Sequence, residues 1–255
     1  MIQKWKITIP ELTGDETRRA YIYVPNSFKK DPSRRYPVLY MFDGHNVFYD
    51  RDATYGKSWG MKQYMDRSRT EMIIAAVECN HSPDGGRLSE YSPFTFTEQS
   101  LGTITGRGQI TMDWMVNTFK PYIDENYPTL PDRDHTFIAG SSMGGLMSLY
   151  ALMEYNHVFS RAAALSPSIW FAADQIKKMI KEADLHPNTH LYMDYGSREM
   201  RFRSNMRSQF GKVATQLLNR RVMLDCRIVP WGDHCEASWE KQIPIFMNTL
   251  LYELH

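Results

Sequence analysis

The sequence has few cysteines, no long apolar run and no excess of charge of either sign. Its three cysteines, Cys79, Cys226 and Cys235, form no Cys-x-x-Cys pair, which argues against a disulfide framework and against a structural zinc site. No segment approaches the apolar length of a membrane span, and residues 1–6 lack the apolar core of a signal peptide. We therefore expect a soluble, cytoplasmic chain without a membrane partner.

The charges of the chain are nearly balanced. Its 30 lysine and arginine residues and 29 aspartate and glutamate residues give a formal net charge of +1, so no nucleic-acid partner is expected. Hydrophobic residues make up 42% of the 255 residues, which is enough for a buried core. The length fits one large α/β domain, and we expect residues 1–255 to form a single domain. The composition is compatible with a homo-oligomer.

Short apolar runs alternate with segments of helical spacing. The predicted strands are Ile2–Ile9, Arg19–Val24, Tyr36–Phe42, Glu71–Glu78, Thr136–Ala139, Ala162–Leu165, His190–Tyr195 and Val222–Val229. The predicted helices are Trp59–Met65, Ile110–Phe119, Gly145–Tyr155, Asp174–Lys181, Arg203–Leu218 and Trp239–Tyr252. Two antiparallel opening strands followed by βα alternation predict a mostly parallel sheet with helices on both faces. The polar, glycine-rich segment Cys79–Gly108 is predicted to be a long functional loop.

The most informative segment is Gly140-Ser141-Ser142-Met143-Gly144, which fits Gly-x-Ser-x-Gly. It lies between a predicted strand and a predicted helix, as a nucleophile elbow does. Glycines flank the serine because a Cβ at either position would crowd the neighbouring strand or helix. The pattern alone is equally typical of a glycine-rich turn, and the strand before it and the helix after it favour catalysis by Ser142.

A serine nucleophile needs a histidine base, and that histidine needs a carboxylate to orient it. In α/β-hydrolases the order along the chain is serine, acid, histidine, each beyond the carboxyl end of a strand. His234 fits this order, because it follows the last predicted strand and precedes the last helix. His157, His186 and His190 also follow Ser142, but His157 ends the helix after the elbow, on the wrong side of the sheet, and His186 and His190 are better explained as surface or strand-edge residues.

Two carboxylates compete for the role of the acid. Glu199 lies past Gly196, on the loop where the acid belongs, whereas Asp194 lies within the apolar run of the preceding strand. We favour Glu199 and leave Asp194 open, since either could instead form a salt bridge. Asp233 and Glu236 flank His234 too closely in sequence to orient its ring by the usual geometry.

An oxyanion hole requires two backbone N–H groups. One is expected from Met143, directly after the serine, and the other from His45 in the turn after the strand Tyr36–Phe42. The turn could equally be no more than the end of a strand. No His-Glu-x-x-His or clustered carboxylate pattern is present, so neither a metal nor another cofactor is expected.

Several ordered motifs together resemble the putative-esterase family of α/β-hydrolases, which includes esterase D, enterochelin-type siderophore esterases and carbohydrate esterase family one. The matching segments are residues 39–48, Arg87 with 90–93, 139–145, 165–170, Gly196 with Glu199, and Gly232 with His234, Glu236 and Trp239. The resemblance implies an α/β-hydrolase fold without a separate lid domain. It implies Ser142 as nucleophile, His234 as base and Glu199 as acid, with the oxyanion hole formed by the backbones of His45 and Met143. Arg87, Tyr91 and Trp170 would line or brace the substrate pocket.

The resemblance predicts a serine esterase that forms an acyl-serine intermediate. The substrate is expected to be an acetyl or feruloyl ester of a carbohydrate, either a small molecule or an oligosaccharide, because aromatic residues near the pocket can stack on sugar or aryl groups. A siderophore esterase, an S-formylglutathione-type thioesterase and an acyltransferase are alternatives. A different class, a non-catalytic α/β-hydrolase-fold binding protein, predicts a disrupted triad, yet all three side-chain types are present in order.

Overall fold

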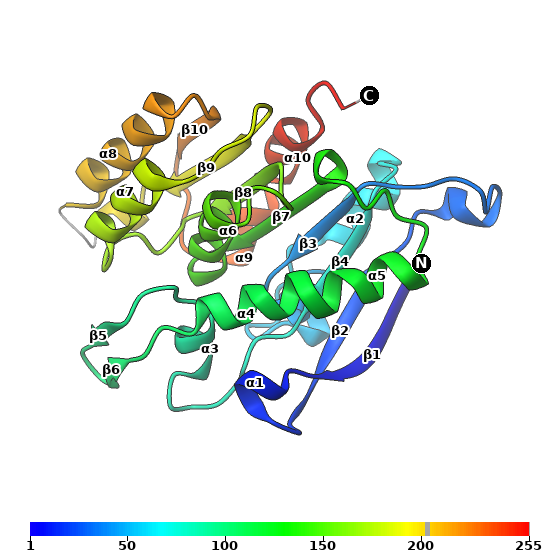
Figure 1. Ribbon diagram of the computed structural model, residues 1–255, viewed down its shortest axis with the longest axis horizontal. Helices are drawn as coiled ribbons and strands as arrows, with labels where there is room; N and C mark the ends of the chain where they lie inside the picture. Colours follow the sequence, from blue (N-terminus) through cyan, green and yellow to red (C-terminus); the bar gives the residue numbers. More distant parts are fainter. Residues whose placement is uncertain (202–204, 255) are drawn as a thin grey trace.

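The computed structural model describes residues 1–201 and 205–254, whose main feature is an eight-stranded sheet with helices on both faces (Figure 1). The strands, in spatial order, are β1 (Ile2–Thr8), β2 (Thr17–Tyr23), β4 (Ile73–Val77), β3 (Val38–Met41), β7 (Thr136–Ser141), β8 (Arg161–Leu165), β9 (His190–Gly196) and β10 (Met223–Val229). β2 runs antiparallel to β1 and β4, and every pair from β4 to β10 is parallel. The predicted mostly parallel α/β fold is confirmed.

The two faces of the sheet bury separate hydrophobic clusters, because successive side chains of a strand point to opposite faces. In β3, Val38 and Tyr40 belong to one cluster, and Leu39 and Met41 to the other. The first cluster includes residues of α4 (Gly108–Trp114), α5 (Lys120–Asn126), α6 (Met143–Glu154), α7 (Ala173–Glu182) and α8 (Met206–Asn219). The second includes residues of α2 (Met61–Ser68), α9 (Glu236–Glu240) and α10 (Ile243–Leu251), which lie behind the sheet in Figure 1.

Two sequence predictions were wrong in detail. The expected loop Cys79–Gly108 contains α3 (Gly86–Glu90) and a hairpin of β5 (Phe96–Glu98) and β6 (Gly102–Ile104), elements too short to show a period. The expected helix Trp239–Tyr252 is divided into α9 and α10, because Pro244 lies in the first turn of α10, where a missing N–H costs nothing. The helix expected from Arg203 begins at Met206, and Arg203 lies outside the described residues.

The parallel strands bring distant segments together at one edge of the sheet. The loops that follow β3, β4, β7, β9 and β10 carry His45, Cys79, Ser142, Glu199 and His234 respectively. The carboxyl ends of parallel strands meet at the same edge, which is where open α/β sheets place their sites. In the described part of the chain, no helix is both long and apolar enough to cross a bilayer.

Candidate active site

Ser142 occupies a strained turn between β7 and α6. Its backbone has φ 58° and ψ −120°, a conformation that costs a non-glycine residue about 1–3 kcal/mol. The turn is held by a 2.9 Å hydrogen bond from the Ser142 N–H to the Leu165 carbonyl. A Cβ on Gly140 would lie 2.7 Å from the Gly144 carbonyl group, so the strand and helix approach each other only because glycine stands there. The local geometry is that of the predicted elbow.

His234 and Glu199 form a direct pair. The Glu199 Oε2 atom lies 2.6 Å from the His234 Nδ1 atom, the glutamate side chain being 6% exposed and the histidine side chain 46%. The other carboxylate oxygen, Oε1, accepts hydrogen bonds from the Gly196 N–H at 2.9 Å and the Ser166 hydroxyl at 2.7 Å. The Trp239 indole in turn donates to the Ser166 hydroxyl at 3.0 Å. The carboxylate is therefore fixed on one side and presents its free oxygen to the imidazole.

The loops that carry Glu199 and His234 contact each other through their backbones. A Cβ on Gly196 would lie 2.3 Å from the Gly232 carbonyl oxygen, a distance that no side chain allows. The Arg198 N–H also donates to the Gly232 carbonyl at 3.1 Å. The loop after β9 and the loop after β10 are thereby held together, with Glu199 on one and His234 on the other.

Asp194, the alternative acid, lies inside the sheet. Its carboxylate accepts hydrogen bonds from the Tyr192 hydroxyl at 2.7 Å and the Ser166 N–H at 3.0 Å, and the residue is 1% exposed. Burial raises the pKa of Asp194 to about 7, although both hydrogen bonds favour the charged form. Asp233 is paired instead with Arg198, at 2.9 Å on the surface. Of the proposed carboxylates, Glu199 is the one that faces the imidazole of His234.

Asp43 organises the opposite wall of the cleft, a role that the sequence analysis did not assign. The Arg87 guanidinium donates two hydrogen bonds to the Asp43 carboxylate, at 2.7 and 2.6 Å. Burial is the largest single influence and acts to raise the pKa of Asp43, but the charge and the hydrogen bonds of Arg87, together with weaker effects of His45 and Cys79, hold the pKa below its usual value. The backbone N–H of Asp43 donates to the Tyr91 hydroxyl at 3.2 Å. No local sequence pattern indicates this pairing, because Asp43 and Arg87 are 44 residues apart.

Tyr91 therefore lies in the core, behind the cleft wall that Asp43 and Arg87 form. It is 3% exposed, it packs edge-on against Phe42 with ring centroids 5.0 Å apart, and the Arg87 guanidinium lies over its ring. Of the two roles expected for Tyr91, lining or bracing the pocket, this position fits bracing, through Asp43. Burial of an aromatic ring with its hydroxyl satisfied is the usual arrangement for tyrosine in a core.

The cleft has two lobes that meet at Ser142, Arg87 and His234. The Trp170 lobe, of about 340 Å³, is also lined by Met143, Ser168, Trp170, Tyr195 and Glu199. The His45 lobe, of about 750 Å³, is also lined by Asp43, His45, Cys79, His81 and Glu236. The structure thus brings Ser142, His234, Glu199, Arg87 and Trp170 to one cleft, as expected. The Ser168 hydroxyl, which the sequence analysis did not single out, lies 3.4 Å from that of Ser142.

Met143 and His45, the two residues expected to form the oxyanion hole, each line one lobe of the cleft. Met143 is the first residue of α6, and the first N–H groups of a helix have no partner within it. His45 lies in the short 3₁₀ helix η2 (Gly44–Asn46), entered through Asp43 in a left-handed conformation with φ 55°. The His45 ring is 4% exposed, and burial lowers its pKa, so the ring is neutral near pH 7.

This fold, with a Gly-x-Ser-x-Gly turn at the carboxyl edge of a mostly parallel sheet, is that of the α/β-hydrolases. The sequence profile of the family described as Putative esterase matches residues 13–250, and the chain belongs to that family. The protein is thus a carboxylic ester hydrolase.

Both sequence relatives and solved structures are similar to this chain. The uncharacterized protein YbbA of Bacillus subtilis is 26% identical over 203 residues, which span 78% of this chain and 76% of YbbA. A solved ferulic acid esterase is 18% identical, with a TM-score of 0.67 over 98% of this chain and 97% of its own. The enterobactin esterase FES of Shigella flexneri is 17% identical, with a TM-score of 0.76 over 100% of this chain and 60% of its own.

Proposed function

We propose that the protein hydrolyses carboxylic esters through an acyl-serine intermediate on Ser142. The observation that carries the proposal is the 2.6 Å contact between Glu199 and His234, on a cleft that Ser142 also lines. Glu199 accepts the Nδ1–H of His234, which leaves Nε2 unprotonated and able to take the proton of the Ser142 hydroxyl. The serine oxygen then bonds to the ester carbonyl carbon.

The charge that develops on the carbonyl oxygen requires donors. The backbone N–H groups of Met143 and His45 fill this role, because they belong to the first turns of α6 and η2. Collapse of the tetrahedral intermediate breaks the bond to the leaving alcohol, which receives the proton from His234. Water, deprotonated by the same histidine, then attacks the acyl carbon. The bond to the Ser142 oxygen breaks, the carboxylic acid leaves, and His234 returns the proton to the serine oxygen.

The substrate we propose is an acetyl or feruloyl ester of a carbohydrate. Trp170 lines the smaller lobe and packs edge-on against Phe171, with ring centroids 5.1 Å apart, which gives that lobe an aromatic wall for an aryl or sugar ring. The larger lobe carries Asp43, Glu236 and Arg87, polar groups suited to the hydroxyls of a carbohydrate alcohol. The ferulic acid esterase among the similar structures supports this choice.

The mechanism is tested with Ser142→Ala on p-nitrophenyl acetate. We expect kcat to fall roughly 10³-fold or more, because the nucleophile is removed while the fold is retained. Ser208→Ala, on the exposed face of α8, is the matched control and should retain full activity. Unchanged hydrolysis by Ser142→Ala would falsify the mechanism.

The substrate is tested separately on a panel of acetylated xylan, methyl ferulate, a catecholate siderophore and S-formylglutathione. The highest kcat/KM is expected for one of the first two substrates. A clear preference for the siderophore or the thioester would replace the carbohydrate assignment and leave the role of Ser142 intact.

A further inference from the structure

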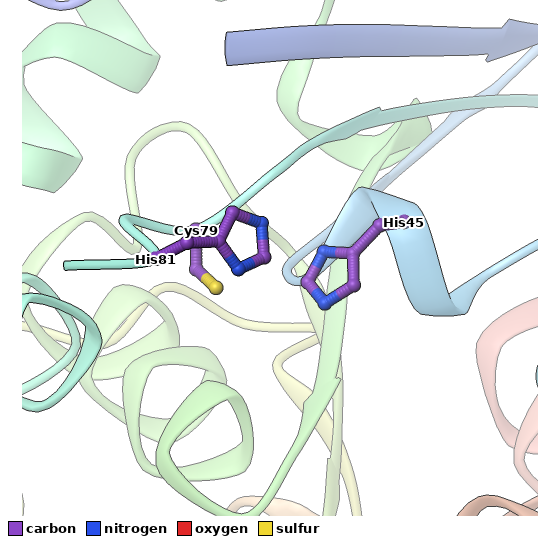
Figure 2. Close-up of side chains that lie close together, drawn as sticks. All are labelled: His45, Cys79 and His81. Atoms are coloured by element: carbon purple, nitrogen blue, oxygen red, sulfur yellow. The ribbon is translucent and has the colours of Figure 1, made fainter. Parts of the chain in front are cut away.

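We propose that His45, Cys79 and His81 form a binding site for a zinc-class divalent metal ion in the larger lobe of the cleft (Figure 2). One ligand atom from each of these side chains lies within 4.8 Å of the other two. His45 follows β3, and Cys79 and His81 follow β4. Because β3 and β4 are neighbouring parallel strands, their carboxyl ends bring the three residues together from segments 34 residues apart in sequence.

The buried His45 ring carries an atom whose bonding is incomplete. Its Nε2 lies 3.0 Å from the Thr54 hydroxyl, while among the described residues no polar atom partners its Nδ1. A buried polar atom without a partner is rare and costs free energy. The hydroxyl of Thr54, itself placed by a hydrogen bond from its N–H to the Asn46 side chain, can accept the Nε2 proton. That tautomer leaves Nδ1 with a free lone pair, which is how histidine ligands are held in metal sites.

The other two residues lie close to this ring. Figure 2 shows the His45 and His81 rings facing each other, with the Cys79 sulfur beside His81. The ring centroids are 4.7 Å apart and nearly perpendicular, at 68°. Ligand atoms around a tetrahedral zinc ion are about 3.3–3.8 Å apart, so the side chains would close by roughly an ångström. His81 is exposed and can make this movement, whereas His45 and Cys79 are fixed in the core.

The donor set selects the metal. One thiolate and two imidazoles are ligands that zinc prefers, and calcium and magnesium require oxygen donors instead. The Cys79 thiol releases its proton to solvent when it binds the ion. Asp43 and Glu236 line the same lobe and favour a cation there, although Arg87 opposes them. Three protein ligands leave a fourth position open toward a lobe that Ser142 also lines, as in metal sites that exchange a ligand.

The site is tested by titrating the chelator-treated protein with Zn²⁺ by calorimetry and with Co²⁺ by absorbance. We expect one equivalent of Zn²⁺ with a Kd of about 10 µM or tighter. Bound Co²⁺ should show a thiolate charge-transfer band and the visible bands of a tetrahedral site. Cys79→Ser and His81→Ala should each weaken Zn²⁺ binding about 100-fold or more. Cys79→Ser should also remove the thiolate charge-transfer band of Co²⁺, and His81→Ala should reduce its visible bands.

Two variants serve as controls in the same lobe. Cys235→Ser tests the other thiol that lines it, and His234→Ala tests a site formed with Glu199; both should bind Zn²⁺ like the unmodified protein. His81 is on the surface, so His81→Ala keeps the test available if Cys79→Ser fails to fold. Absence of Zn²⁺ binding, binding unaffected by both ligand variants, or loss of binding in either control would each overturn the proposal.

Discussion

Each wall of the cleft contains a histidine near a carboxylate, and the two walls use them in opposite ways. On the β9–β10 wall, Glu199 contacts His234 directly, and the histidine is exposed to the cleft. On the β3–β4 wall, Asp43 is taken by Arg87, and the buried His45 keeps one ring nitrogen without a hydrogen bond. What each imidazole can do therefore depends on which group pairs with the nearby carboxylate, more than on how near that carboxylate lies. The first suits proton transfer, and the second suits coordination.

The largest difference between the two walls should appear in kcat when the histidine of each wall is replaced in turn. His234→Ala should lower kcat on p-nitrophenyl acetate roughly 10³-fold or more, because no base remains. His45→Ala should lower it about tenfold, since the ring takes no part in proton transfer and supports the loop whose backbone N–H we propose as an oxyanion donor. Steady-state kinetics on both variants, with circular dichroism as the check on folding, measure the contrast. Equal losses in the two variants would contradict it.

The two carboxylates at the end of β9 should also differ. Glu199→Gln should lower kcat by about 10²- to 10⁴-fold with little change in KM, because the amide no longer holds the imidazole in the required tautomer. Asp194→Asn, which keeps the shape of a side chain that does not touch His234, should lower kcat less than about tenfold. A larger loss of kcat in Asp194→Asn than in Glu199→Gln would contradict the assignment of Glu199 as the acid.

The smallest effect concerns stability on the β3–β4 wall. Arg87→Ala should lower the free energy of unfolding by about 2–4 kcal/mol, because it leaves the Asp43 carboxylate buried without its partner. This range is below that of a wholly buried pair because the Arg87 side chain is 29% exposed. Arg198→Ala, which breaks the exposed pair with Asp233, is the matched control and should cost less than about 1 kcal/mol. Urea unfolding measures both.

The pH dependence of that variant has a definite sign. The folded pKa of Asp43 lies below its unfolded value of 3.8, so the pair stabilises the protein fully above that pH. The contribution is lost as the pH falls through the folded pKa. The stability difference between the unmodified protein and Arg87→Ala should therefore shrink on acidification, and a difference that grows would show that Asp43 is not the group affected.

The sequence predicts the fold well and leads to the proposed triad, because both depend on order along the chain. Each apolar run became a strand, and loops after parallel strands must meet at one edge, so Ser142, Glu199 and His234 could be brought together without coordinates. The contact between Glu199 and His234 could not be distinguished from one with Asp194, because only the register of β9 shows that Asp194 is enclosed by Tyr192 and Ser166.

Features that depend on contacts across the sheet could not be predicted. Tyr91 was expected to line or brace the pocket, and only the structure shows that its hydroxyl accepts a hydrogen bond from the Asp43 N–H, 48 residues away. The cluster of His45 with Cys79 and His81 has no recognisable spacing, because it is assembled from the ends of two strands. The β5–β6 hairpin was missed for a different reason: each strand has three residues, too few to show a period, and Phe96 and Ile104 pair across it and pack into the core.

The contact between Gly196 and Gly232 has a practical consequence for engineering. Two loops that touch through their main chains at this distance cannot be exchanged one at a time, since a new sequence in either would push the other away. Loop libraries aimed at altered selectivity should treat the segments after β9 and β10 as one cassette and keep both glycines constant.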